Sequence, residues 1–224
     1  MRGSPAYQIV QEPPHPPIRE HARGPATSPH GGEVKRASRS SEPIGTHLLR
    51  DDSTALGLGL PFGHSDAITL ERLIDEARNA GALSVRPAPG RALLVIGVAR
   101  ARAHSLAAAA ERLGFIVNPS DPRRRIVACA GAPVCAAGQI PARALAPAIA
   151  ATAEPLLDQQ TTIHLSGCAK GCAHSGPATV TIVGLDGRCG IVPAGTAQDD
   201  PLETVGVAEL PARIAALLRE AAHG

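Results

Sequence analysis

Apolar residues follow regular spacings after about residue 42, and the first part of this pattern predicts a small unit of strands and helices. Helical spacing starts at Ser65 and stops at Gly81, a residue type that commonly ends helices. The continuous apolar run from Leu93 to Val98 predicts a buried strand. Five elements are expected here, alternately strand and helix: residues 55–60, 65–81, 93–98, 105–113 and 115–117. This β-α-β-α-β order over residues 42–120 predicts a ferredoxin-like half-domain in an α/β (α+β) fold.

A second patterned region follows the break at residues 118–122. Its expected elements are strands at 126–128 and 162–165, a hairpin of 178–183 and 188–192, and helices at 142–157 and 214–221. Asp186-Gly187 is a typical hairpin turn, and Pro147 and Pro155 predict that the first of these helices is kinked or split. Residues 121–224 are therefore expected to form a second domain.

The first 41 residues carry many Pro, Gly, Ser, Arg and His residues and few apolar ones. Burial of so few apolar side chains cannot offset the entropy that is lost on ordering. We therefore expect residues 1–41 to be a disordered N-terminal segment.

The composition excludes several classes of function. Aromatic residues make up 1% of the chain, so a nucleic-acid site built on base stacking is not expected. A net charge of +2 gives no broad field for a polyanion. The longest apolar run, Ala92–Ala99, is too short for a membrane span, and the N-terminus lacks a signal-peptide pattern. We expect a cytoplasmic protein with reduced thiols and with neither nucleic-acid nor membrane partners.

Four of the five cysteines form two pairs, and each pair follows a predicted strand. Five residues separate Cys129 from Cys135, and three separate Cys168 from Cys172. Four thiolates are a usual ligand set for a [4Fe-4S] cluster, and the Gly and Ala residues around them let the backbone approach a bulky group. Two alternatives stay open: a zinc site, for which a five-residue gap is long, and four buried free thiols. Cys189 lies alone in a predicted strand and is expected to pack in the core.

Both cysteine loops resemble those of the nitrite and sulfite reductase superfamily and, within it, of the precorrin-3B synthase family. The matching segments are Ala-Cys-Ala-Gly-Ala-Pro-Val-Cys-Ala (128–136), Ser-Gly-Cys-Ala-Lys-Gly-Cys-Ala-His (166–174), Leu-Pro-Phe-Gly (60–63), Arg-Pro-Ala-Pro-Gly-Arg (86–91) and Asp-Pro-Arg-Arg-Arg (121–125). The resemblance covers about residues 43–224 and corresponds to the C-terminal half of such proteins. It implies that residues 121–224 form a nitrite/sulfite reductase-type domain whose cluster ligands are Cys129, Cys135, Cys168 and Cys172.

The resemblance implies an oxidoreductase, a monooxygenase that uses O2 to hydroxylate precorrin-3A. A lactone closes in the same conversion to precorrin-3B, a step of aerobic cobalamin biosynthesis. A mononuclear non-haem iron is implied as a further cofactor, and NADH as an indirect donor whose electrons arrive through a separate reductase or ferredoxin. Because relatives bind sirohaem, a fragment of a sirohaem-dependent sulfite or nitrite reductase is one alternative. A non-catalytic iron–sulfur electron carrier is another.

A tetrapyrrole substrate with many carboxylates calls for Arg and Lys side chains. Arg123, Arg124 and Arg125 directly precede the first cysteine strand, and Arg91 lies in a turn of the first unit. Lys170 lies between two cluster cysteines, at a position where the resemblance to sulfite reductases leads one to expect Asn. These five residues are the candidates for substrate binding, against the plain alternative that an arginine in a loop is solvated.

Two histidines near the second cysteine loop are candidates for chemistry. His174 follows Cys172 by two residues, and His164 lies in the strand before the loop, so either could bind an iron or move a proton. A histidine within a strand is more often a packed or surface residue, and His174 is therefore the stronger candidate. With Lys170, it is expected to be catalytic. The sequence shows no set of two histidines and one carboxylate, so the ligands of a non-haem iron stay unassigned.

Members of the superfamily consist of two pseudo-repeated halves with the tetrapyrrole between them. The resemblance therefore implies a partner for this chain, either another polypeptide that supplies the first half or a second copy of the chain itself. The spacing of Gly57, Gly59 and Gly63 is not that of a dinucleotide-binding fingerprint, which favours a separate electron donor.

Overall fold

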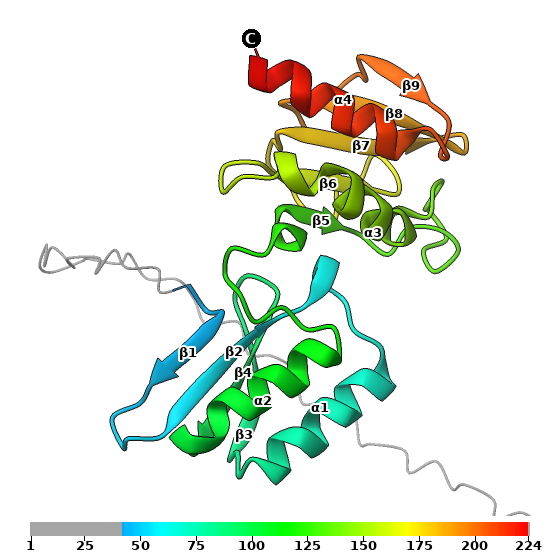
Figure 1. Ribbon diagram of the computed structural model, residues 1–224. Helices are drawn as coiled ribbons and strands as arrows, with labels where there is room; N and C mark the ends of the chain where they lie inside the picture. The colour runs from blue at the N-terminus through cyan, green and yellow to red at the C-terminus, as the bar shows by residue number, and fades with distance from the viewer. Residues whose placement is uncertain (1–41, 224) are drawn as a thin grey trace, which may run out of the picture. The chain divides into compact units, whose positions relative to one another are not determined.

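The first sheet of the structure has four antiparallel strands in the order β1-β2-β4-β3 (Figure 1). The computed structural model describes residues 42–223, and the prediction for residues 1–41 lies outside them. The elements of this part are β1 Gly45–Leu48, β2 Thr54–Gly59, the 3-10 turn η1 Pro61–Gly63, α1 Ala67–Asn79, β3 Ser84–Ala88, β4 Ala92–Val98 and α2 Arg100–Arg112. Both helices cover one face of the sheet, where Leu73 and Leu106 pack against Leu56, Leu58 and Val95.

The order of elements in this part differs from the predicted β-α-β-α-β. The strands β2 and β4 and the helix α1 are confirmed, whereas β1 and β3 are additional. Both are edge strands with half-exposed or exposed residues, and β3 contains Pro87, so neither shows a buried strand pattern. The strand predicted at residues 115–117 is wrong, because Ile116 makes only an isolated bridge to Gly59. The helix α2 begins at Arg100 rather than near Ser105; residues 100–102 of its first turn are exposed, and Ala103 is the first buried residue.

The second sheet has five strands in chain order, of which β5, β6 and β7 are parallel and β7, β8 and β9 are antiparallel. Its elements are η2 Pro122–Arg125, β5 Ile126–Ala128, α3 Ala142–Ala153, η3 Glu154–Leu156, β6 Ile163–Ser166, β7 Val180–Leu185, β8 Arg188–Pro193, β9 Glu203–Val205 and α4 Leu210–His223. The hairpin turn at Asp186-Gly187 is confirmed. Pro147 lies inside α3 without ending it, and the predicted split occurs beside Pro155, in η3. The short strand β9 is half-exposed and was not expected.

Strand alternation gives the second sheet two different faces. One face packs against α3 and α4 and is apolar: Ile126, Ala128, Ile163, Leu165, Val180, Ile182, Cys189 and Ile191. Cys189 is fully buried there, as expected, and burial raises the pKa of its thiol. The other face carries the buried polar side chains His164, Ser166 and Thr181 beside a small apolar cluster of Val183, Val192 and Ala197. One face therefore forms the core, and the other faces the second cysteine loop.

The mixed α/β fold expected from the sequence is confirmed by these two sheets and their helices. The first sheet lies within residues 45–98 and the second within residues 126–205, and a domain division near residue 120 stays a prediction. Within residues 42–223, no helix combines the length and apolar character that crossing a membrane requires.

The core of the first sheet gives a stability prediction. Leu58→Ala removes a fully buried side chain that packs between the sheet and its helices, so we expect unfolding to require about 2–5 kcal/mol less free energy. Leu48→Ala, at a side chain that is 61% exposed on the edge strand β1, is the matched control and should change stability by no more than about 0.5 kcal/mol. Urea unfolding followed by circular dichroism measures both, and equal effects would contradict this account of the core.

Candidate functional site

The two cysteine loops lie side by side because the strands that precede them are neighbours. β5 and β6 pair in parallel, so both chains leave the sheet at the same edge. The Cys129 N–H donates to the carbonyl oxygen of Leu165 at 3.1 Å, and the Gln139 N–H donates to that of Gly167 at 2.7 Å. Two segments about thirty residues apart in sequence are thus held against each other by backbone hydrogen bonds.

Glycines allow this close approach. A Cβ atom on Gly167 would lie 3.0 Å from the Cα of Gly131 and 3.4 Å from that of Gly138. A Cβ atom on Gly184 in β7 would lie only 2.3 Å from the carbonyl oxygen of Gly167. Side chains at these positions would push the two loops apart, so the small residues noted in the sequence have a steric purpose.

The four loop cysteines are free thiols on these adjacent loops. Cys129 and Cys168 are half-buried, whereas Cys135 and Cys172 are exposed. The Gly167 N–H donates to Cys129 Sγ at 3.1 Å, the kind of hydrogen bond that stabilises sulfur ligands of iron–sulfur clusters. The donor chemistry, the N–H aimed at sulfur and the glycine contacts fit a cluster, and the ligand role of the four cysteines stays a prediction.

No group of three or more His, Cys, Asp or Glu residues among residues 42–223 is placed to hold a single metal ion. A tetrahedral zinc with Zn–S bonds of about 2.3 Å would draw its sulfurs to within roughly 4 Å of each other. A cubane instead holds each thiolate on a different iron, which leaves the sulfurs farther apart. The two kinds of site therefore make different geometric demands on the same four thiols.

His164 in β6 and His174, two residues after Cys172, have neighbouring rings. Their ring centroids are 5.6 Å apart in an edge-to-face arrangement, and His174 Nε2 lies 3.2 Å from the carbonyl oxygen of Pro177. His164 is fully buried, and neither of its ring nitrogens has a hydrogen-bond partner among residues 42–223. Burial, followed by the nearby His174, lowers the pKa of His164 to about 4, so its imidazole is neutral at pH 7.

A basic pocket of about 410 Å³ opens beside His174. Its lining residues come from four separate parts of the chain: Gly90, Arg91, Arg124, Arg125, Val127, Thr162, Ala173 and His174. Arg124 pairs with Glu42 at 2.6 Å, and Arg125 donates to the carbonyl oxygen of Gln159 at 3.0 Å. Burial lowers the pKa of Arg91, and the positive charges of Arg124 and Arg125 lower it further. Three guanidinium groups with one paired carboxylate make a pocket that favours anions.

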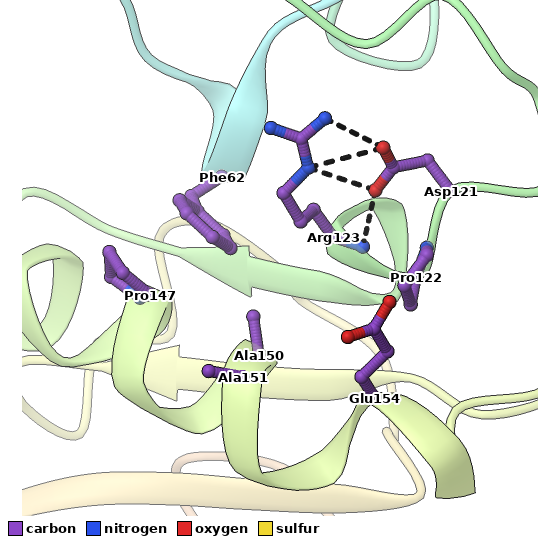
Figure 2. A pocket seen from close by; sticks show the side chains of 8 residues that line it. All are labelled: Phe62, Asp121, Pro122, Arg123, Pro147, Ala150, Ala151 and Glu154. Carbon is purple, nitrogen blue, oxygen red and sulfur yellow. Dashed lines mark hydrogen bonds and ion pairs between the residues drawn. The ribbon is translucent and has the colours of Figure 1, made fainter. Parts of the chain in front are cut away.

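The structure thus brings together three of the five predicted substrate-binding residues and one predicted catalytic residue. Arg123 lies elsewhere, in a pocket of about 380 Å³ between η1 and α3, where its guanidinium faces the Asp121 carboxylate (Figure 2). The two side chains form an ion pair at 2.6 Å, and hydrogen bonds from Arg123 lower the pKa of Asp121 although burial opposes this. Lys170 is exposed on the second cysteine loop and does not line the basic pocket.

Sequence reasoning missed the burial of His164 and the contribution of Glu42 and Thr162. The alternation of strand residues could have placed His164 on the face opposite Ile163 and Leu165, but no local signal shows that a loop covers that face. Glu42 meets Arg124 across 82 residues of sequence, a contact that no local pattern reveals.

Comparisons with known proteins give first the fold of the chain and then its relatives by sequence. No protein-family model matches the chain. Its fold is the nitrite/sulfite reductase fold, because the structure of the Mycobacterium tuberculosis NirA protein matches it with a TM-score of 0.65, over 79% of this chain and 36% of that one, at 23% identity. A sulfite reductase [ferredoxin] 2 from Mycolicibacterium paratuberculosis is 27% identical over 74% of this chain and 29% of the relative.

One relative shares more of its sequence with this chain than the sulfite reductase does. A precorrin-3B synthase from Sinorhizobium sp is 36% identical over 191 residues, which make up 84% of this chain and 42% of that protein. The chain therefore spans less than half the length of these curated relatives. The resemblance predicted from the cysteine loops is confirmed: this chain is similar to part of a precorrin-3B synthase and of sulfite reductases.

The environment of His164 predicts a pH dependence of stability in the reduced, metal-free protein. Its pKa of about 4 lies below the ordinary value near 6.5, so the unfolded chain binds the proton more readily. The free energy of unfolding should therefore fall as the pH drops through this window, by up to about 3 kcal/mol between pH 7 and pH 4.

Urea unfolding at several pH values tests this dependence. His164→Gln should lose much of the fall, whereas His104→Gln, at an exposed residue of α2, should keep it. A His164 ring that titrates near its ordinary pKa in NMR spectra would contradict the buried, neutral state.

Proposed function

We propose that this chain is the iron–sulfur part of an oxidoreductase of cobalamin biosynthesis, one that converts precorrin-3A to precorrin-3B with O2. The observation that carries the proposal is the 36% identity to a precorrin-3B synthase. Because the alignment takes in 84% of a 224-residue chain, it necessarily includes both cysteine loops. The basic pocket beside the second loop supports the same assignment, since the substrate is a tetrapyrrole with many carboxylates.

Cys129, Cys135, Cys168 and Cys172 would hold a [4Fe-4S] cluster, which supplies single electrons at this site when it is bound. The backbone N–H of Gly167 would stabilise the thiolate of Cys129. Lys170 lies between two of the cysteines and is exposed, so its ammonium group can meet an acidic substrate beside the cluster loop. A mononuclear non-haem iron would be a further cofactor, and its ligands stay unassigned.

The basic pocket would bind acidic arms of the substrate. Arg125 offers guanidinium donors to carboxylates, and each such charge-assisted hydrogen bond contributes about 1.5–3 kcal/mol. The terminal nitrogens of Arg124 donate to the carbonyl oxygen of Pro119 and to Glu42, so Arg124 contributes its positive charge and would bind a carboxylate directly only if the Glu42 pair opened. His174 lines the same pocket and would hold or donate a proton at a substrate oxygen. Arg123 is engaged by Asp121 in the other pocket, so a direct role for it in substrate binding would require that ion pair to open.

The proposed reaction balances with one external donor. One oxygen atom of O2 enters the product as a hydroxyl group while an acetate arm closes to a lactone. The other oxygen leaves as water with two electrons and two protons. NADH would supply the electrons through a separate reductase or ferredoxin. The proposal includes a partner that completes the tetrapyrrole site, either another polypeptide or a second copy of this chain.

Anaerobic reconstitution with iron and sulfide tests the cluster. We expect about four irons and four sulfides per chain, with the visible absorption and EPR signal of a [4Fe-4S] cluster. Cys135→Ala changes an exposed side chain and should abolish these signals without unfolding the protein. Cys189→Ala is the matched control and should retain the cluster, because Cys189 lies in the core. Bound zinc in place of iron, or full cluster content in Cys135→Ala, would overturn the ligand assignment.

Turnover of precorrin-3A under O2 tests the reaction. With a reductase, a ferredoxin and the partner that completes the tetrapyrrole site present, the reconstituted chain should give a product heavier by one oxygen atom. Arg125→Ala should raise KM at least about tenfold through loss of a charge-assisted hydrogen bond. Arg72→Ala, at an exposed residue of α1, should leave KM unchanged.

Other outcomes of these experiments separate the alternative functions. An extracted green pigment with a Soret band would identify a sirohaem-dependent reductase. Sulfite reductase is the activity named for the 27% identical relative. A complete cluster without turnover, also when the partner that completes the tetrapyrrole site is present, would identify an electron carrier. Light scattering of the reconstituted protein decides whether the chain pairs with itself.

A further inference from the structure

Arg91 is the point at which three segments of the chain meet. Its Nη1 donates to the carbonyl oxygen of Ile126 at 2.8 Å, and its Nη2 donates to that of Arg124 at 2.9 Å. Its own carbonyl oxygen accepts the N–H of Leu60 at 2.8 Å. Its side-chain stem lies against η1, since a Cβ atom on Gly63 would be 3.0 Å from Arg91 Cδ. The turn between β3 and β4 is thereby tied both to η1 and to the start of the second sheet.

The two carbonyls that accept from Arg91 belong to residues at the basic pocket and at the start of β5. Arg124 is itself a lining residue of the basic pocket, and Ile126 is the first residue of β5. β5 is the edge strand of the second sheet, and three residues after Ile126 the chain reaches Cys129. A planar guanidinium can donate to both carbonyls at once, which a lysine ammonium cannot reproduce. Arg91 thus fixes the segment that carries two pocket arginines and leads into the first cysteine loop.

Arg91 makes these contacts although its backbone conformation and the burial of its charge are both energetically unfavourable. Its φ is +59°, in the left-handed region that glycine adopts most easily. Its guanidinium is also half-buried beside two like charges, which lowers its pKa. Both costs fall on a residue whose two terminal nitrogens are already used by carbonyls, so its side chain is poorly placed to bind a carboxylate directly.

We infer that Arg91 is a positioning residue, which joins the first sheet to the second and sets the direction of Arg124 and Arg125 in the basic pocket. The part of this inference that concerns substrate rests on the proposed function. The structural part is independent of it: the Arg91 guanidinium, here called the joint, links the two sheets through its hydrogen bonds to Arg124 and Ile126.

Amide hydrogen exchange and citrate binding test the inference on the full chain. Arg91→Ala keeps the same backbone demand but removes the guanidinium. We expect at least about tenfold faster exchange at the amides of Arg124, Ile126 and Cys129. Citrate, a small tricarboxylate probe for the pocket, should bind about tenfold more weakly. Arg91→Lys keeps the charge and should restore neither property.

Two further variants complete the design. Arg86→Ala changes an exposed arginine of the same hairpin and should match the unaltered chain in both measurements. Arg125→Ala should weaken citrate binding and leave exchange at Ile126 and Cys129 unchanged, as expected of a direct ligand. This contrast separates a residue that binds from one that positions.

The outcomes distinguish the two proposals. Unchanged exchange in Arg91→Ala and Arg91→Lys would overturn the joint, and weaker citrate binding with unchanged exchange would make Arg91 a direct ligand instead. If Arg91→Ala does not fold, Arg91→Lys decides the matter. Failure of citrate to bind the unaltered chain would count against the anion pocket of the proposed function, while the exchange data would still decide on the joint.

Discussion

The parallel pairing of β5 with β6 is the constraint on which the candidate site depends. Parallel neighbours end at the same edge of a sheet, and here both continue directly into a cysteine loop. The loops then bond to each other through backbone groups of Cys129 and Gln139. An antiparallel arrangement of the same two strands would have sent the two cysteine pairs to opposite edges. The sheet topology, rather than any single side chain, thus decides that two cysteine pairs can act on one group.

Close backbone contact between the loops is the second requirement, and it explains why so little of this region could carry larger side chains. Gly131, Gly138 and Gly167 approach each other within van der Waals distance, and Gly184 supports Gly167 from the neighbouring strand. Backbone N–H groups can reach a sulfur only where side chains do not intervene, as Gly167 reaches Cys129. The abundance of small residues in both loops is therefore part of the site and not merely a feature of flexible connections.

The cysteine loops could be predicted from the sequence because their signal is local: residue type, short spacing and a preceding strand. The edge strands β1 and β3 could not, since edge positions show no buried pattern. Arg123, Arg124 and Arg125 are equivalent in sequence, yet they lie in a 3-10 turn. Consecutive side chains there point about 120° apart, so Arg123 faces Asp121 while the next two face the basic pocket. The remaining features of the site depend on contacts between residues far apart in sequence, such as Arg91 with Ile126, and these could not be predicted from local patterns.

Buried hydroxyls on the His164 face of the second sheet hold two loops in place, one of them the second cysteine loop. Ser166 Oγ donates to the carbonyl oxygen of Cys168, and Thr181 Oγ1 donates to that of Gly195, both at 2.7 Å. Each hydroxyl satisfies a carbonyl of a loop that crosses this face, so the buried polar groups are largely compensated. His164 differs, since both its ring nitrogens are buried without a partner among residues 42–223. Such a group costs stability unless a further molecule satisfies it. The His164 ring lies 5.6 Å from that of His174, one of the residues that line the basic pocket. The unpartnered His164 is therefore the buried polar side chain of this sheet that lies nearest to the basic pocket through His174, while the opposite face forms the main core.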